Sequence, residues 1–209
     1  YSQGPAFDLV IRNGHVVDGT GSPWFAADVG IKGDTIAAVA PQLDATGARV
    51  IDATGLIVAP GFIDVHTHSD AGQTVVPGDT IEPLVRDDRQ DIIGNPAAEN
   101  DVRQGVTTVM GGPDGFGTPQ VAAWLAKVAA ARPAINIGAF IGHGAVRKAV
   151  LGMDNRPATA DELRRMREMV ASGMREGAFG LSTGLFYVPA NYAPLDEVVE
   201  LAKVAGQFG

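Results

Sequence analysis

Two histidines, His66 and His68, follow an apolar stretch that begins after Pro60-Gly61. In an extended chain, side chains alternate between two faces, so residues i and i+2 project to the same side. Asp64 has the same parity. Two imidazoles on one face at the end of a buried strand can bind one metal ion, with nitrogen–zinc distances of about 2.0–2.1 Å. Because this pair uses two of the four histidines in the chain, the spacing favours a metal site over two unrelated loop histidines.

Further polar residues follow three later apolar stretches. Asp114 lies in a Gly-rich turn, His143 lies between two glycines, and Ser182 and Tyr187 lie in a Gly-Leu-Ser-Thr-Gly-Leu-Phe-Tyr segment. Asp114 can bind a metal or simply form a Pro-Asp-Gly turn. His143 can orient a substrate or hydrogen-bond to backbone, and Tyr187 can contact a ligand or cover the end of the fold with its ring. We treat His143, Ser182 and Tyr187 as candidate substrate contacts.

From Gly61 onward, apolar strands alternate with helical segments, which is typical of βα units around a parallel sheet. Thr159 and Glu162 have the spacing of a capping box at the start of one helix. The expected strands are 61–66, 106–110, 135–141 and 178–182, and the expected helices are 118–131, 159–176 and 194–206. A closed (β/α)₈ barrel has eight such units in about 250 residues, with its site at the carboxyl ends of the strands. Residues 60–209 therefore predict the first half of a TIM-type barrel, an α/β fold completed by further residues of the same chain or by a second chain.

Residues 1–59 predict a small β-sandwich segment, because short strands alternate with turn signals. Hairpins are expected around Asn13-Gly14, Lys32-Gly33-Asp34 and Ala53-Thr54-Gly55. His15 lies in the first of these, where we expect a structural or exposed role. Residues 70–100 show little periodicity and predict a long loop, and loops of this length in compact domains are usually functional or mobile.

The composition excludes several classes of protein. The net charge of −8 and the scatter of the 16 basic residues argue against nucleic acid as a partner. The one basic cluster, residues 164–167, predicts a solvated helix face. The chain contains no cysteine, so disulfides and thiolate metal sites are excluded. No stretch approaches the roughly 18–20 apolar residues of a membrane span. A start at Tyr1 suits a removed export signal or a trimmed chain, so a cytoplasmic and a periplasmic location both stay open.

Several motifs resemble the opening of amidohydrolase-superfamily enzymes. They comprise residues 7–14, 17–21, 27–31 and 60–68. Two more, residues 104–109 and 177–187, are similar to the N-acyl-D-amino-acid deacylase branch, which is also called the D-aminoacylase branch. The resemblance spans nearly the whole chain. It implies a zinc-dependent hydrolase of linear amide bonds that acts on an N-acyl-D-amino acid or a related small amide.

The resemblance also implies roles for particular residues. It makes His66 and His68 ligands of one metal position in a centre of one or two divalent ions. It places Asp114 where that branch commonly has cysteine, which exchanges a soft thiolate for a hard oxygen. It places Tyr187 in the substrate pocket. The later histidine ligands and the general acid–base aspartate would come from strands five, six and eight, beyond Gly209, so no catalytic residue is assigned within the chain.

Two alternatives stay open. One is another amidohydrolase, of the dihydroorotase or isoaspartyl-dipeptidase kind. The other is a non-catalytic half that binds a complementary chain, since half a barrel would leave sheet edges and an apolar face unpaired. Residue pattern alone does not decide the acyl group, the preferred stereochemistry, the metal or the oligomeric state.

Overall fold

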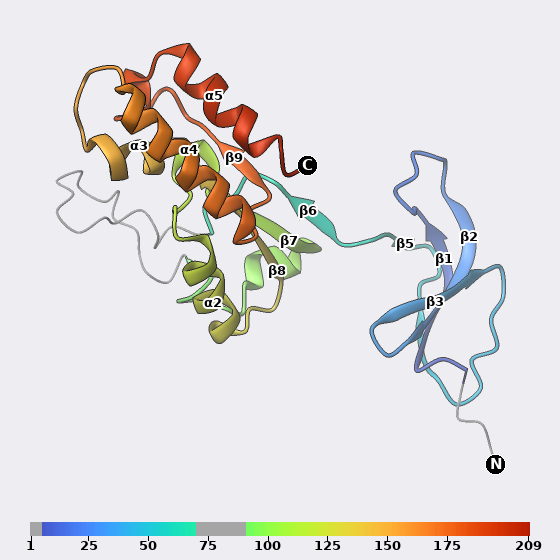
Figure 1. Cartoon of the computed structure of the whole chain (residues 1–209). Coiled ribbons are helices and arrows are strands. Elements are labelled where there is room, and N and C mark those ends of the chain that lie inside the picture. The colour runs from blue at the N-terminus through green and yellow to red at the C-terminus, as the bar shows by residue number, and fades with distance from the viewer. Residues whose placement is uncertain (1–5, 70–90) are drawn as a thin grey trace. The chain divides into compact units, whose positions relative to one another are not determined.

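The computed structural model describes residues 6–69 and 91–209 of the 209-residue chain. The chain divides into two compact units, Tyr1–Pro60 and Gly61–Gly209 (Figure 1). Each unit contains its own β-sheet. Within the described ranges, no helix combines the length and the apolar character that crossing a membrane requires.

The first unit contains one five-stranded sheet with the order β3-β2-β1-β4, in which β5 also pairs with β1. Its strands are β1 (Leu9–Val16), β2 (Phe25–Lys32), β3 (Thr35–Ala40), β4 (Arg49–Asp52) and β5 (Ile57–Val58). Strands β2 and β3 are antiparallel neighbours, which confirms the predicted hairpin at Lys32-Gly33-Asp34. The described residues of this unit form a single sheet, whereas a β-sandwich needs two. The β-sandwich predicted for residues 1–59 therefore stays a prediction.

The other two predicted hairpins are wrong. Asn13 has φ 62° and Gly14 follows it, but the pair forms an irregularity inside β1 and does not reverse the chain. The turn at Ala53-Thr54-Gly55 joins β4 to β5, and both strands run parallel to β1 and pair with successive parts of it. Residues that adopt positive φ suit bulges and offsets as well as tight reversals, so the residue types alone did not distinguish them. His15 therefore lies within a strand, where its ring stacks on Trp24 at 3.8 Å between centroids.

The second unit is built on a parallel sheet with the order β6-β7-β8-β9. Its strands are β6 (Phe62–Asp64), β7 (Val106–Gly111), β8 (Asn136–Gly142) and β9 (Gly180–Ser182). Its helices are α1 (Glu99–Arg103), α2 (Val121–Ala131), α3 (His143–Leu151), α4 (Ala160–Arg175) and α5 (Leu195–Ala205), with short 3₁₀ turns η3 (Pro113–Gly115) and η4 (Ala190–Tyr192). Four parallel strands joined through helices confirm the predicted α/β class and strand order.

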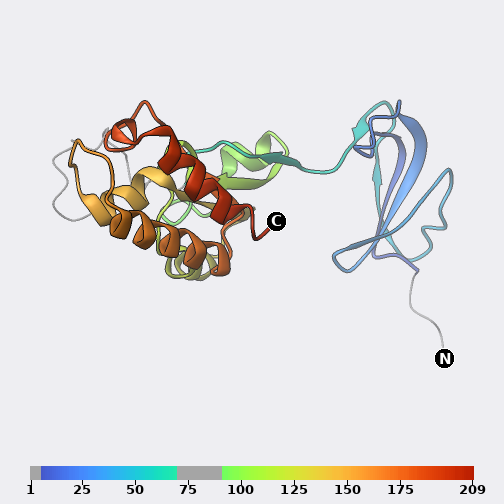
Figure 2. The same ribbon diagram turned by 45° about the horizontal axis from the view of Figure 1, so that its top comes forward.

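The core of this unit lies between the sheet and its helices. Val109 and Ile141 on β7 and β8 are fully buried, as are Met166 on α4 and Leu201 on α5. Helices α4 and α5 lie side by side in Figure 1 and in the turned view of Figure 2. Each fully buried aliphatic side chain contributes roughly 1.5–3 kcal/mol, so this layer supplies the main stabilisation of the unit.

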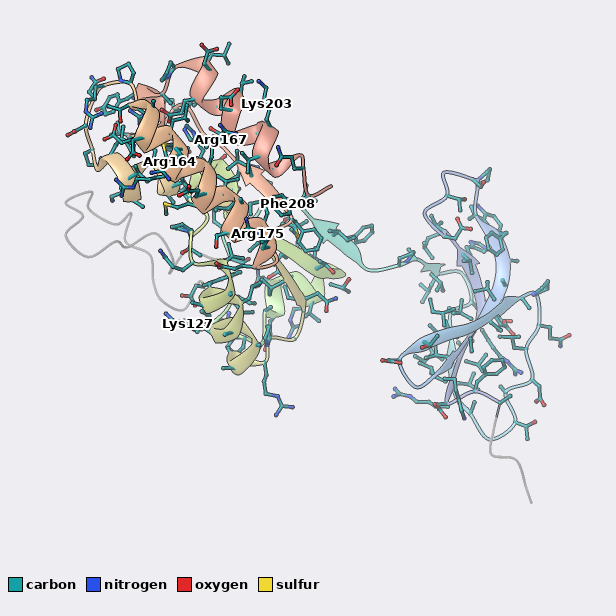
Figure 3. The ribbon with its side chains drawn as sticks, viewed as in Figure 1. Lys127, Arg164, Arg167, Arg175, Lys203 and Phe208 are labelled. Carbon is teal, nitrogen blue, oxygen red and sulfur yellow. The ribbon has the colours of Figure 1, made fainter. Side chains whose placement is uncertain are left out.

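Helix α4 begins and is oriented as its sequence predicts. Thr159 accepts a hydrogen bond from the Glu162 backbone N–H, and the Glu162 carboxylate accepts one from the Thr159 backbone N–H, which confirms the capping box. Figure 3 shows Arg164 and Arg167 on this helix, and both are exposed and ion-paired, Arg164 with Asp161 and Glu168 and Arg167 with Glu200 on α5. The basic cluster is therefore the solvated helix face that was predicted.

Two helices of this unit were not predicted. Helix α1 lies at the end of the expected 70–100 loop, whose residues 70–90 lie outside the described ranges. Helix α3 follows β8 with no intervening loop, because its N-cap residue Gly142 is also the last residue of the strand. Glycine in the first turn, at 144, lowers helix propensity and concealed this helix in the sequence. His143 is the first residue of this helix, and its side chain is fully buried.

The carboxyl ends of the strands pack backbone against backbone. A Cβ atom on Gly142 would lie 2.3 Å from the carbonyl oxygen of Gly115, and one on Gly117 would lie 2.0 Å from that of Phe140. Neither distance can be tolerated by real atoms, so both glycines are required by space, although neither needs a positive φ. This packing holds the turn after β7 against the end of β8.

Substitution of Gly142 by alanine should therefore destabilise the protein by about 1–3 kcal/mol, the usual cost of overpacking. The matched control is Gly180→Ala at the neighbouring strand, where the nearest atom to the new Cβ is 3.7 Å away, so no loss is expected. Denaturant midpoints of the two variants provide the comparison. Equal midpoints would show that the turn yields at little cost.

Candidate metal centre

His66, His68 and Asp114 come together at the carboxyl end of the sheet. The Asp114 Oδ2 atom lies 3.4 Å from Nε2 of His66 and 3.4 Å from Nε2 of His68. Within residues 6–69 and 91–209, this is the one group of three His, Asp or Glu side chains whose ligand atoms all lie within 4.8 Å of one another. The side chains are 62%, 45% and 25% exposed, so the cluster lies at a solvent-accessible rim.

Two of the three donor separations match those around a zinc-sized ion. Bonds of about 2.0–2.2 Å in a tetrahedral arrangement place neighbouring ligand atoms about 3.3–3.6 Å apart. The two 3.4 Å separations lie in that interval. Two imidazole nitrogens and one carboxylate oxygen form a borderline donor set of the kind that suits zinc and neighbouring divalent transition metals. Three protein ligands would leave a coordination position for water or substrate. The metal-binding role itself stays a prediction.

A turn, and not strand pleating, holds the two histidines on the same side. Strand β6 ends at Asp64, two residues before the predicted end of the strand. The Asp64 carboxylate accepts a hydrogen bond of 2.9 Å from the backbone N–H of His66, so Asp64 shapes the turn and is not a member of the cluster. After His66, the hydroxyls of Thr67 and Ser69 hydrogen-bond to each other at 2.8 Å. The rings of His66 and His68 lie 5.8 Å apart and nearly perpendicular.

Asp114 occupies an unusual backbone conformation. It has φ 57° and ψ 20° inside η3, a left-handed geometry that is uncommon for residues other than glycine. Asp tolerates this geometry better than most residues, so the turn-forming role and the ligand role are compatible. Such strain persists only where the surroundings enforce it, and it is concentrated at functional sites. The geometry therefore supports a functional role for this turn.

Ser182 faces the turn that carries Asp114. Its hydroxyl donates to the carbonyl oxygen of Gly112 at 2.5 Å and accepts from the backbone N–H of Gly115 at 3.1 Å. Both the donor and one acceptor position of the hydroxyl are thus used within the chain. The described contacts therefore lend no support to the predicted substrate contact of Ser182.

His143 lies behind the rim in a buried network. Its side chain is fully buried, with Nδ1 2.9 Å from the Thr183 hydroxyl and Nε2 3.0 Å from Oε1 of Glu197. The other Glu197 oxygen accepts from Arg147 at 2.5 Å, and Arg147 also donates to the carbonyl oxygen of Arg156. Both ring nitrogens of His143 are occupied, so the geometry gives no support to its predicted substrate contact.

Sequence reasoning did not find Glu197 and Arg147. The i, i+4 spacing of His143 and Arg147 places them on one helix face, a signal that required helix α3 to be predicted first. Burial raises the pKa of Glu197. The hydrogen bonds with His143 and Arg147 together lower it by a larger amount, so the net pKa lies below the ordinary value of a glutamate. Glu197 is therefore ionised at neutral pH and balances the buried guanidinium.

Tyr187 lies in an aromatic cluster beside the same turn. Its ring is 4.7 Å from that of Phe116, which directly follows η3, and 5.4 Å from that of Phe186. Phe186 is 86% exposed. The predicted substrate contact of Tyr187 stays a prediction, and Phe116 is a neighbour that the sequence did not single out.

The model of an amidohydrolase family matches residues 49–208. The chain belongs to the amidohydrolase family. This membership confirms the superfamily resemblance, and the chain is also similar to proteins of the deacylase branch.

Among its relatives, the chain is 38% identical over 224 residues to N-acyl-D-glutamate deacylase of Alcaligenes xylosoxydans xylosoxydans, covering 97% of this chain and 42% of that protein. It is 34% identical over 226 residues to D-aminoacylase of the same organism, covering 100% and 44%. The crystal structure of N-acyl-D-glutamate deacylase from Bordetella bronchiseptica, complexed with zinc and a phosphonate inhibitor that mimics the tetrahedral intermediate, matches with a TM-score of 0.79 and 34% identity, covering 96% and 43%. The chain thus spans less than half the length of these relatives, and its fold matches a part of theirs.

The buried network of this amidohydrolase makes a pH-dependent prediction. Glu197→Gln should cost on the order of 3 kcal/mol at neutral pH, because it leaves the buried Arg147 without a counter-charge. The folded-state pKa of Glu197 is lowered, so its stabilisation is present above the unfolded value of about 4.3 and is lost as pH falls through the folded value. The stability difference between wild type and Glu197→Gln should therefore shrink from about pH 7 to about pH 3.

The control is Glu200→Gln on the same helix, whose partners Lys203 and Arg167 are solvent-exposed, so its loss should destabilise the protein much less. Thermal melts across the pH range measure both effects. A difference for Glu197→Gln that stays constant with pH would contradict the assigned ionised network.

Proposed function

We propose that this chain forms one wall of the active site of a zinc-dependent deacylase of N-acyl-D-amino acids. The observation that carries the proposal is the three-residue donor set, with one Asp114 oxygen 3.4 Å from both histidine nitrogens. Family membership and the names of the relatives, which are deacylases of N-acyl-D-amino acids, support this substrate class. The N-acyl-D-amino acid is the proposed small-molecule partner.

His66, His68 and Asp114 would hold the metal in this proposal. A bound divalent ion of this kind polarises a carbonyl group and lowers the pKa of water to about 7. Both histidines would bind through Nε2 as neutral imidazoles, which requires the proton on Nδ1. Asp114 would neutralise one of the two positive charges and leave the centre electrophilic. The general acid–base aspartate is placed by resemblance after Gly209, and no described residue is assigned that role.

The aromatic cluster is the proposed substrate-facing surface of this half. Phe116 and Tyr187 lie directly beside the turn that bears Asp114, and Phe186 is exposed next to them. Aromatic rings can bury apolar parts of an acyl amino acid, and the Tyr187 hydroxyl can donate to its polar groups. This places an apolar contact within reach of a metal-bound amide.

The remainder of the barrel is the proposed macromolecular partner, in the same or a second chain. Strands β6 and β9 are the two edges of the described sheet. Phe62 and Ile63 on β6 and Phe179 before β9 are more than half exposed. Unpaired edges that carry exposed apolar side chains are a liability in water, and further strands would cover them.

The substrate class is tested with the full-length protein. A panel should contain N-acyl-D-amino acids, their L-enantiomers, cyclic amides and β-aspartyl dipeptides. We expect the highest kcat/KM for an N-acyl-D-amino acid. Faster hydrolysis of a cyclic amide or a β-aspartyl dipeptide would move the protein to another amidohydrolase activity, and no hydrolysis by a metal-loaded protein would favour a non-catalytic role.

The metal role is tested by His66→Ala and His68→Ala. Each should lower the metal content and reduce kcat/KM by at least about a hundredfold, since loss of even an outer-shell partner costs 10–100-fold. His15→Ala is the matched control, because His15 lies in strand β1 and stacks on Trp24. Metal analysis and amide hydrolysis are the measurements. A double variant that keeps both metal and rate would refute the proposed centre.

The identity of the third ligand makes a separate prediction. Asp114→Cys exchanges a hard oxygen for a soft thiolate, so the affinity for Cd²⁺ should rise relative to that for Mn²⁺. Competition titrations of the two ions measure the ratio. Asp161→Cys, on the exposed face of α4, is the control and should leave the ratio unchanged. An unchanged ratio in Asp114→Cys would mean that Asp114 does not bind the ion.

A further inference from the structure

The hydroxyl of Ser182 hydrogen-bonds to backbone atoms that lie before and after Asp114 in the sequence. It donates to the carbonyl oxygen of Gly112 at 2.5 Å and accepts from the N–H of Gly115 at 3.1 Å, so it binds the turn on both sides of Asp114. We infer that Ser182 is a positioning residue that sets the place of the Asp114 carboxylate relative to His66 and His68. It thereby sets the affinity for the divalent ion without touching the ion or the substrate. The inference rests on the proposed metal centre.

The turn needs a brace because its conformation is unfavourable. Asp114 is left-handed, and such a residue costs of order 1–3 kcal/mol unless the surrounding structure enforces it. A hydroxyl can donate and accept at once, so one side chain can bind a carbonyl and an N–H of the same turn. Alanine at 182 would remove both bonds, and the turn could then relax and move the carboxylate away from the histidines.

The segment that bears Ser182 approaches the turn too closely for a side chain. A Cβ atom on Gly184 would lie 2.3 Å from the carbonyl oxygen of Asp114. A Cβ atom on Gly115 would lie 3.1 Å from the backbone nitrogen of Gly184. The backbone after β9 therefore packs directly on the turn, and the Ser182 bonds act over a contact that is already formed.

The brace is itself anchored. Thr183, the residue after Ser182, hydrogen-bonds to Nδ1 of the buried His143, and His143 binds Glu197. The end of β9 is thus tied to helices α3 and α5 as well as to the turn. Because β9 and the turn are both held in place, neither can shift freely to compensate for the loss of the Ser182 hydroxyl. The position of that hydroxyl therefore affects the position of Asp114.

The test uses the full-length protein and measures Zn²⁺ affinity by competition with a chromogenic chelator. We expect Ser182→Ala to raise the dissociation constant 10–100-fold, the effect typical of an outer-shell partner, while Ser182→Thr, which keeps the hydroxyl, stays within about threefold of wild type. Thr183→Val is the matched control. It removes a hydroxyl one residue away and should lower the melting temperature, because His143 loses a partner, while it raises the dissociation constant less than Ser182→Ala does, because both Ser182 bonds to the turn remain.

A double-mutant cycle with Asp114→Ala separates positioning from general destabilisation. If Ser182 acts through Asp114, Ser182→Ala should have no further effect on affinity in the Asp114→Ala background. An equal effect in both backgrounds, or wild-type affinity in Ser182→Ala, would overturn the inference. A wild-type protein that binds no Zn²⁺ would instead refute the proposed metal centre.

If Ser182→Ala does not fold, Ser182→Cys decides the question. Its thiol keeps the shape of the side chain but is only a weak donor and acceptor. Mn²⁺ is then the probe, because thiolates have little preference for it. A rise in the Mn²⁺ dissociation constant at an unchanged melting temperature supports the inference, and an unchanged constant overturns it.

Discussion

The packing of backbone on backbone at the carboxyl ends of β7, β8 and β9 is the constraint on which the rim depends. Gly117 lies against the carbonyl of Phe140, Gly142 against that of Gly115, and Gly184 against that of Asp114, each too closely for a Cβ atom. Three strand ends and the turn after β7 are thereby joined without intervening side chains. Such contacts leave little freedom, which explains how a non-glycine residue is kept in a left-handed conformation at the centre of the candidate site.

A second layer supports this rim from inside. The buried network of His143, Glu197 and Arg147 connects the N-terminus of α3 to α5, and Thr183 links it to the end of β9. Buried charges are costly to leave unpaired, so the network favours one relative placement of these elements. The rim residues and the network residues thus have different tasks. The rim residues His66, His68 and Asp114 are accessible to solvent. The buried network residues help to fix the positions of the elements beside the rim.

Much of this arrangement follows from sequence pattern, but not all of it. The parallel sheet and the meeting of His66, His68 and Asp114 were predictable, because apolar strands that alternate with helices bring strand ends to one rim. Helix α3 was not, because it begins on the last residue of a strand and carries glycine in its first turn. The two bonds of Ser182 connect residues that are separated by 67 and 70 positions in the sequence, and the bond between His143 and Glu197 connects residues separated by 54 positions. No local sequence pattern predicts contacts at such separations. At Asn13-Gly14, one residue pair suits both a reversal and a bulge, and tertiary pairing decided between them.

The brace on the Asp114 turn has a consequence for metal selectivity. The turn is held by the bonds of Ser182 with the backbone of Gly112 and Gly115 and by the bond from the Phe116 N–H to the Pro113 carbonyl oxygen, and the side chain at position 114 contributes none of these. The two Ser182 bonds therefore do not depend on which donor atom the side chain at position 114 carries. In the proposed centre, a substitution at position 114 would exchange the donor atom while both Ser182 bonds remain, so metal selectivity would change without a change in the bonds that hold the turn.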